Sequence, residues 1–193
     1  MYPCLQLAKK AVENYIKKRE VIELPEGLPK DLTNKKAGVF VTIEKNGKLR
    51  GCIGTYLPTK ENIAKEIIYN AIAAATEDWR FGPIQREELN LLSYTVYILE
   101  KPELVKDLKE LNPKKYGIIV KTTPITYPNG TDVVFNGHFV PKSALLLPDL
   151  EGIDTVEKQI SIACQKGGID PLREKIIIYK FGAKKISEKN GSS

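Results

Sequence analysis

Apolar and polar positions follow two different spacings along the chain, and each spacing predicts a different kind of element. Over residues 4–19, apolar side chains recur every three or four positions opposite a lysine-rich face, which predicts an amphipathic helix. The apolar face comprises Leu5, Ala8, Ala11, Val12, Tyr15 and Ile16. The same spacing between Ile63 and Ala75 predicts an alanine-rich helix that Thr59 caps and that ends near Glu77.

Runs of β-branched and aromatic residues predict strands instead. These runs cover residues 38–43, 49–54, 92–99, 116–122 and 175–185. Asn46-Gly47 lies between the first two runs and is the preferred two-residue hairpin turn, because both central positions need positive φ. A second turn at Tyr127-Pro128-Asn129-Gly130-Thr131 predicts another hairpin over residues 118–136.

A last helix is predicted to begin after Thr155 and to end at Gly167-Gly168. Strands joined by hairpins and interrupted by helices predict an α+β fold with a largely antiparallel sheet flanked by helices. The length of 193 residues fits one domain over residues 1–193, with residues 190–193 as a free tail.

Composition narrows the class of protein. With 42% hydrophobic and 28% charged residues, the chain is typical of a globular protein. It has no apolar run long enough to span a bilayer and no signal-peptide layout, so we expect a cytoplasmic protein without membrane association. The net charge of +6 comes from intermixed basic and acidic residues, and nucleic-acid binding is therefore not favoured. Abundant lysine and isoleucine suit a thermophile.

Cysteine and histidine usage limits the chemistry. Cys4, Cys52 and Cys164 are odd in number and far apart, which argues against a disulfide framework. With no C-x-x-C pair and His138 as the sole histidine, the chain alone cannot assemble a structural zinc site. It also lacks the glycine spacing of phosphate-binding loops and a nucleophile elbow, so we expect no metal and no cofactor.

The stretch Leu49-Arg50-Gly51-Cys52-Ile53-Gly54 carries the strongest candidate chemistry. Alternation along a strand predicts that Arg50 and Cys52 share one face while Ile53 faces the core. The positive charge would favour the Cys52 thiolate, and the two glycines would let a ligand or another backbone approach closely. Arg50 and Cys52 are therefore the candidate catalytic residues. The alternative is a buried cysteine that serves as a small hydrophobe.

Two further places offer helpers for this thiol. In Asp78-x-Arg80-Phe81, Arg80 could bind a carboxylate or phosphate through two nitrogens, with Asp78 orienting it. The alternative for this segment is an ion pair and an aromatic plug that close a loop. His138 is the only histidine that could act as a base for Cys52, but its place beside a predicted turn fits a solvated side chain better.

Taken in order, several motifs resemble the AMMECR family. They are Leu49-Arg50-Gly51-Cys52-Ile53-Gly54, Asp78-x-Arg80-Phe81-x-Pro83, Leu145-Leu146-Leu147-Pro148, Cys164-x-Lys166-x-Gly168 and Tyr179-x-Phe181. The resemblance extends over residues 36–188 and implies two lobes with a groove between them near the cysteine motif. The residues that we expect to line this ligand-binding groove are Gly51, Ile53, Gly54, Asp78, Arg80, Phe81 and His138.

The resemblance implies a protein whose biochemical function is not established. In some genomes such proteins are associated with a Memo-like protein and a radical S-adenosylmethionine protein, which implies an enzyme or accessory factor of a modification pathway. The alternative is a non-enzymatic binding or scaffold module for a peptide, nucleotide or RNA. The chain departs from the family at Asp149, where glutamine is common, and in a longer excursion over residues 121–140.

Overall fold

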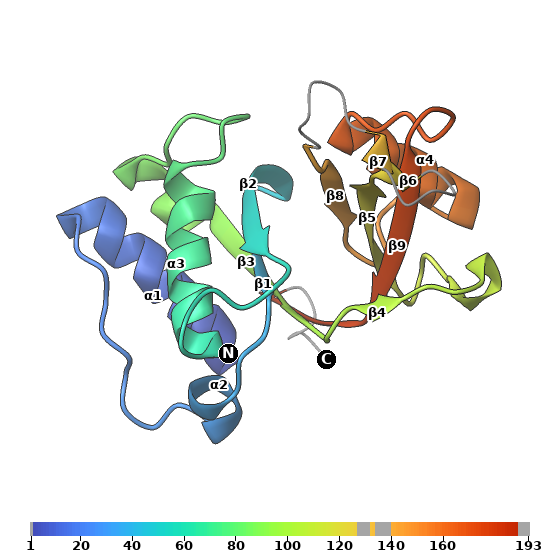
Figure 1. Ribbon diagram of the computed structural model, residues 1–193. Coiled ribbons are helices and arrows are strands. Elements are labelled where there is room, and N and C mark those ends of the chain that lie inside the picture. Colours follow the sequence, from blue (N-terminus) through green and yellow to red (C-terminus); the bar gives the residue numbers. More distant parts are fainter. Residues whose placement is uncertain (1, 127–131, 134–139, 189–193) are drawn as a thin grey trace. The chain divides into compact units, whose positions relative to one another are not determined.

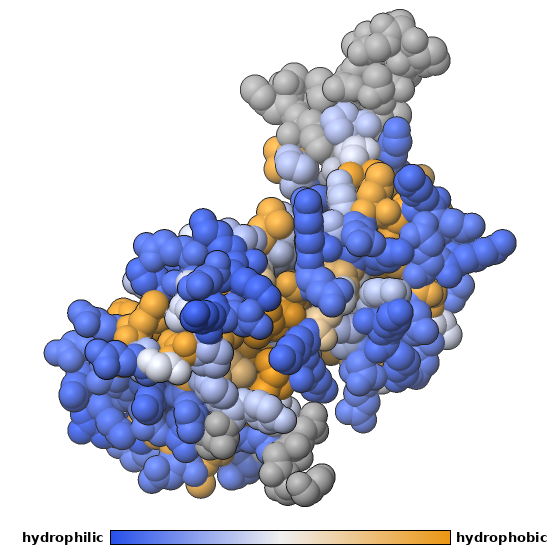
Figure 2. All heavy atoms as spheres, turned by 90° about the horizontal axis from the view of Figure 1, so that it is seen from below, coloured by the Kyte–Doolittle hydropathy of each residue, from blue (hydrophilic) through white to orange (hydrophobic). Residues whose placement is uncertain are grey.

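Two compact units make up the chain in the computed structural model, which describes residues 2–126, 132–133 and 140–188. Unit 1 contains the residues up to Glu100 together with those from Lys184, and unit 2 is Lys101–Ala183. Each unit has a four-stranded antiparallel sheet with helices, which confirms the α+β fold (Figure 1). On the face shown in Figure 2 most of the surface is hydrophilic. No described helix is long and apolar enough to cross a membrane.

The sheet of unit 1 has the strand order β10-β3-β1-β2, and helices α1 and α3 pack on one face of it (Figure 1). Its strands are β1 (Val39–Lys45), β2 (Lys48–Thr55), β3 (Leu92–Leu99) and β10 (Ala183–Ser187). Its helices are α1 (Pro3–Lys18), α2 (Lys30–Asn34), α3 (Ile63–Thr76) and the 3₁₀ helix η1 (Arg86–Leu91). Val39, Val41 and Ile43 of β1 are completely buried toward these helices, as a period of two requires.

The first hairpin is confirmed in its turn as well as in its strands. Asn46 and Gly47 both have positive φ, 52° and 76°, the backbone conformation that made this dipeptide a turn signal. The predicted cap of the alanine-rich helix is wrong, however. Asn62 caps α3 by accepting from Lys65 N at 2.9 Å, because the Thr59 hydroxyl donates to Glu66 instead.

The sheet of unit 2 has the order β4-β9-β5-β8, with α4 packed on one face. Its elements are β4 (Glu103–Leu104), the 3₁₀ helix η2 (Leu108–Glu110), β5 (Gly117–Thr123), β6 (Ile125–Thr126), β7 (Asp132–Val133), β8 (Ser143–Leu146), α4 (Val156–Gly167) and β9 (Lys175–Phe181). The cap of α4 is confirmed, since Thr155 accepts from Lys158 N at 3.2 Å and Gly168 ends the helix with a φ of 60°.

Two strand predictions in unit 2 need correction. The predicted hairpin over residues 118–136 is confirmed only in the short β6 and β7, which pair antiparallel with each other, whereas β5 pairs with the more distant β8 and β9. The predicted turn over residues 127–131 lies outside the described residues. The run over residues 175–185 is two strands, because Gly182 separates β9 in one sheet from β10 in the other.

Candidate functional site

Cys52 lies on β2, one of the two edge strands of the unit 1 sheet, beside an irregularity in the strand pairing. Thr42 pairs with Cys52 and Ile43 with Gly51, but the next partner, Glu44, pairs with Leu49. Arg50 is therefore the extra residue of a β-bulge. The alternation that predicted a shared face for Arg50 and Cys52 does not extend across this bulge.

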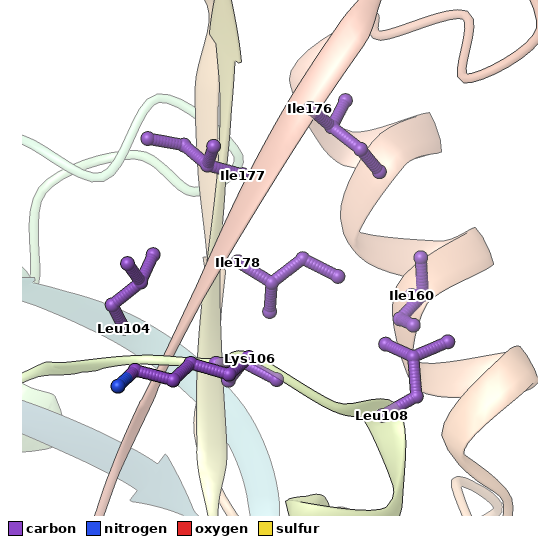
Figure 3. Close-up of a pocket in the computed structure, with 8 residues that line it drawn as sticks. Leu104, Lys106, Leu108, Ile160, Ile176, Ile177 and Ile178 are labelled. Atoms are coloured by element: carbon purple, nitrogen blue, oxygen red, sulfur yellow. The ribbon is translucent and has the colours of Figure 1, made fainter.

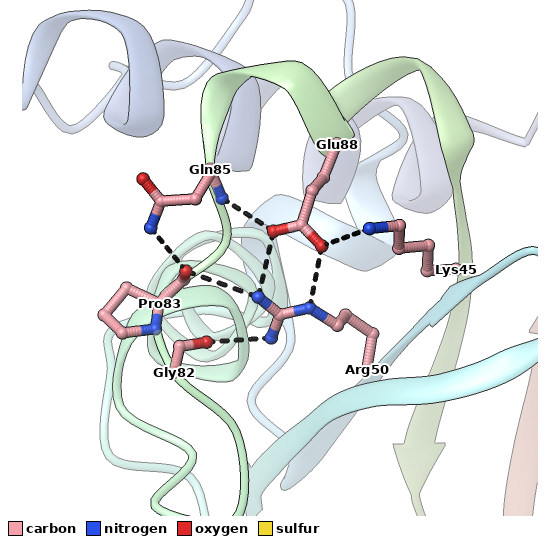
Figure 4. A network of polar contacts seen from close by, with 6 residues as sticks. All are labelled: Lys45, Arg50, Gly82, Pro83, Gln85 and Glu88. Carbon is pink, nitrogen blue, oxygen red and sulfur yellow. Dashed lines mark hydrogen bonds and ion pairs between the residues drawn. The ribbon is translucent and has the colours of Figure 1, made fainter.

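The Arg50 guanidinium lies in a network of polar contacts with Glu88 and the loop before η1 (Figure 4). Nε and Nη2 each donate to a carboxylate oxygen of Glu88 at 3.0 Å, and Nη1 donates to the Gly82 carbonyl at 2.8 Å. Lys45 Nζ also reaches Glu88, at 2.9 Å. Chiefly through the Arg50 hydrogen bonds, the pKa of Glu88 falls to about 2. Each nitrogen of this guanidinium thus has a protein acceptor.

Cys52 is half-buried, whereas the other two cysteines are buried. Its Sγ accepts a hydrogen bond from Thr42 Oγ1 at 3.2 Å, and its backbone N–H donates to Asp78 Oδ2 at 2.8 Å. Burial raises the pKa of both Cys4 and Cys164. Of the three cysteines, Cys52 is therefore the one that is partly exposed and whose sulfur accepts a hydrogen bond from a neighbouring side chain.

Asp78 connects this cysteine to Arg80. The Asp78 residue is 5% exposed, and it accepts from Arg80 Nε at 2.9 Å and from Arg80 Nη2 at 2.7 Å. These bonds, led by that of the Arg80 side chain, lower the pKa of Asp78 to about 2. The Asp78 hydrogen bond is the main cause that raises the pKa of Arg80, and the negative charge of a Cys52 thiolate acts in the same direction.

The Arg80 side chain remains 43% exposed despite this ion pair. Among the described residues, none accepts a hydrogen bond from its Nη1. Its guanidinium carbon lies 5.5 Å from the centre of the half-buried Phe81 ring. Asp78 therefore holds Arg80 in a fixed orientation while part of its guanidinium stays accessible to an anion.

The glycines of the motif serve contacts within unit 1. A Cβ on Gly51 would overlap the Ala74 carbonyl oxygen of α3, and a Cβ on Gly54 would overlap the Phe40 ring. Gly51 thus lets the backbone of a helix, rather than a ligand, approach β2. Ile53 is half-buried and packs against the unit 1 core, as predicted.

The structure brings Cys52, Asp78 and Arg80 together and directs Arg50 to a separate network. His138 lies outside the described residues. Two residues of this arrangement were not predicted, Thr42 and Glu88. Glu88 also accepts from the Gln85 N–H at 2.9 Å at the start of η1, but glutamine is not a residue that marks an N-cap in a sequence, so the spacing carried no signal for Glu88. No cluster of three metal-ligand side chains occurs in the part of the chain that the structure describes.

Comparisons with known proteins agree with this fold. A protein of Thermotoga maritima is 46% identical over 181 residues, which are 93% of this chain and 94% of that protein. Protein TK0174 of Thermococcus kodakarensis is 36% identical over 192 residues, 95% of this chain and 88% of that protein. Several of these relatives come from thermophiles.

Another relative is longer. Protein CA_C1420 of Clostridium acetobutylicum is 41% identical over 180 residues, which are 93% of this chain but 34% of that protein. Among solved structures, the crystal structure of the uncharacterized protein PH0010 from Pyrococcus horikoshii is 31% identical, with a TM-score of 0.79. The match covers 96% of this chain and 90% of that one. The AMMECR1 family model matches residues 5–186, and the chain therefore belongs to the AMMECR1 family.

Proposed function

We propose that the protein acts as an enzyme or accessory factor of a modification pathway, with Cys52 as its functional thiol and Arg80 as the anchor for an anionic group of the substrate. One observation carries the proposal. The buried carboxylate of Asp78 accepts both the Cys52 N–H and the Arg80 guanidinium, so a single group fixes the thiol relative to a cation.

Two features support a reactive sulfur, and one nearby charge opposes it. The thiolate is the nucleophilic form of cysteine, and the Thr42 hydroxyl donates a hydrogen bond that stabilises negative charge on Sγ. The charge of Arg80 attracts a thiolate at Cys52. The negative charge of Asp78 acts in the opposite direction and offsets part of this attraction, because Asp78 forms an ion pair with Arg80.

Arg50 has a positioning role in this proposal. Its side chain is 17% exposed and ties β2 to the loop that follows Arg80, through the carbonyls of Gly82 and Pro83. The Arg50 bonds hold the end of the loop at Gly82 and Pro83, and the bond from Cys52 N–H holds its start at Asp78. Together they keep Asp78 beside the backbone of Cys52. The motif therefore contributes one reactive group, the Cys52 thiol, while Arg50 and the glycines stabilise the local structure.

Alkylation by iodoacetamide tests the proposal. We expect Cys52 to react faster than free glutathione at neutral pH, and we expect Arg80→Gln to slow it at least about threefold, because one favourable charge is lost. The matched control is Arg173→Gln, since the Arg173 side chain is 87% exposed and lies in unit 2. Buried Cys4 and Cys164 report on unfolding in the same digest. If Cys52 reacts no faster than glutathione, the proposal of an activated thiol is wrong.

The second candidate is a binding or scaffold module for a peptide, nucleotide or RNA. It is favoured by the use of Arg50, Gly51 and Gly54 in contacts within unit 1, which leaves the motif with one group for chemistry. If the Cys52→Ser variant keeps full cellular function and the Arg80→Ala variant loses it, binding is supported over catalysis. If the ligand is RNA, its binding should weaken with added salt, and binding that is insensitive to salt would contradict an RNA ligand.

A Memo-like protein and a radical S-adenosylmethionine protein are the proposed partners. Their association with this chain is implied by the family resemblance alone. Sedimentation of the purified chain mixed with the Memo-like protein of the same genome tests the contact. We expect a species with the summed mass, and separate boundaries at all concentrations argue against it.

A further inference from the structure

The outer edge of β9 in unit 2 is paired over only part of its length. Its outer neighbour, β4, consists of two residues, which pair with Lys180 and Tyr179. One further bond joins Val105 N to the Ile178 carbonyl at 2.9 Å, after which the chain turns into η2. The edge of β9 before Ile178 therefore has no outer strand among the described residues.

The orientation of the free backbone groups follows from the same bond. The Ile178 carbonyl points away from β5, and residues two apart on a strand point their N–H and C=O to the same side. The N–H and C=O of Ile176 consequently point outward as well. Among the described residues, no backbone hydrogen bond from a turn, loop or cap reaches either group. A strand edge of this kind accepts an extended chain by strand addition.

An apolar pocket of about 400 Å³ lies beside this edge, between β9, η2 and α4 (Figure 3). Ile176, Ile178 and Leu108 point toward Ile160 of α4 in this view. Leu104 and Leu108 also line the pocket, and they are 49% and 53% exposed, so it opens to solvent. A strand added beside β9 would point every second side chain to the face of Ile176 and Ile178, and hence into the pocket.

The charges around the pocket indicate what would flank such a side chain. Of the acidic groups nearby, Glu110 pairs with Lys180 and Glu174 pairs with Lys142, whereas exposed Glu103 lies opposite Lys180 at the end of the edge that β4 already covers. Lys106, which lines the pocket, and Lys175, which begins β9, form no ion pair with any described residue. These two lysines favour acidic residues in an incoming segment.

We propose that the groove between β9 and α4 binds an extended segment of a partner protein, which adds as a strand beside Ile176, places an aliphatic side chain in the pocket and carries acidic flanking residues. The backbone bonds to Ile176 supply the alignment, and the isoleucines and leucines supply the apolar contact. All of these residues lie in unit 2, so the inference does not depend on the proposed role of Cys52.

The probe is a short fluorescein-labelled peptide of alternating valine and glutamate, titrated with the full chain and followed by fluorescence anisotropy. We expect saturable binding that Leu108→Glu weakens at least about tenfold, because a carboxylate would then occupy the apolar pocket. Leu108 is 53% exposed, which allows the substitution without loss of folding. The matched control is Leu172→Glu, at a 95% exposed leucine of the same unit outside the pocket, and it should bind as the wild type does.

A second measurement on the unmodified protein separates strand addition from simple apolar binding. We expect the same peptide, N-methylated at alternate amides so that its bonding edge is blocked, to lose binding, and the unmethylated peptide to slow hydrogen exchange at the Ile176 amide. Absence of saturable binding, equal weakening by both leucine variants, or binding insensitive to N-methylation overturns the proposal. Self-association that Leu108→Glu abolishes assigns the edge to a second copy of the chain and overturns it too.

Discussion

Arg50 donates through all three of its guanidinium nitrogens, so its planar shape matters as much as its charge. We predict that Arg50→Lys destabilises the protein by about 2 kcal/mol, because lysine cannot reproduce the two-point contact with Glu88. Urea unfolding measures this change. Arg173→Lys, at an 87% exposed side chain, should leave the midpoint unchanged. Loss of function in Arg50→Lys at full stability would instead indicate a direct chemical role for Arg50.

Asp78 and Glu88 predict how stability depends on pH. Their pKa values in the folded protein are about 2, below the ordinary values of 3.8 and 4.5. Both carboxylates therefore stabilise the folded protein when the pH is above their pKa values in the unfolded chain. This contribution is lost as the pH falls from about 5 to 2. We expect each to be worth on the order of 1 to 2 kcal/mol, since solvent screens the partly exposed cations beside them, Arg80 at Asp78 and Lys45 at Glu88.

Urea midpoints measured across this range test the acid dependence. The variant Glu88→Gln should be less stable than the wild type at neutral pH and should lose less stability on acidification, because it lacks one of the two titrating groups. Parallel curves for the two proteins would mean that Glu88 does not contribute to the acid transition.

The contact between Thr42 and Cys52 could not be predicted from the sequence, for a geometric reason. A regular hairpin closed by Asn46-Gly47 would pair Cys52 with Val41. The bulge at Arg50 shifts the register by one residue and brings Thr42 opposite Cys52 instead. The turn was correctly predicted from its residues, but a bulge in the returning strand has no comparable local signal.

At the scale of elements, β2 and α3 approach each other closely where Gly51 meets the Ala74 carbonyl. We predict that Gly51→Ala destabilises the protein by roughly 3 kcal/mol or more, because the added Cβ must displace backbone rather than a flexible side chain. Gly82→Ala is the control, since a Cβ there meets nothing within 4 Å. Thermal unfolding followed by circular dichroism compares the two, and equal melting temperatures would contradict a tight contact.

Elements whose signals are local were predicted well. The apolar spacing of α1, the Asn46-Gly47 turn and the Thr155 cap depend on neighbouring residues, and all three are confirmed. Thr59 failed as a cap because Glu66, one turn into α3, takes its hydroxyl together with that of Thr55 and two backbone N–H groups. A fully hydrogen-bonded buried carboxylate is a tertiary feature, which propensity at one position does not reveal.

At the scale of the whole molecule, the chain leaves unit 1 after β3 and returns to it in β10, which lies beside β3 in the same sheet. Ile186 of β10 belongs to the unit 1 core. The sequence showed one continuous strand-forming run over residues 175–185, because hydrophobic pattern reports local conformation and not which sheet a strand joins. The division into two units follows from the topology that the structure shows.

This topology allows the predicted groove between the lobes to be tested by excision. Joining Glu100 to Lys184 through a short glycine linker should give a folded unit 1, since β3 and β10 are neighbours and the core of this unit is retained. If the cysteine motif borders a groove formed with unit 2, Cys52 is alkylated faster in the excised unit than in the full chain. Cys4 is the internal control, because it is 5% exposed within unit 1 and becomes reactive only if that unit unfolds. An unchanged Cys52 rate, with Cys4 still protected, would mean that unit 1 alone sets the exposure of the thiol.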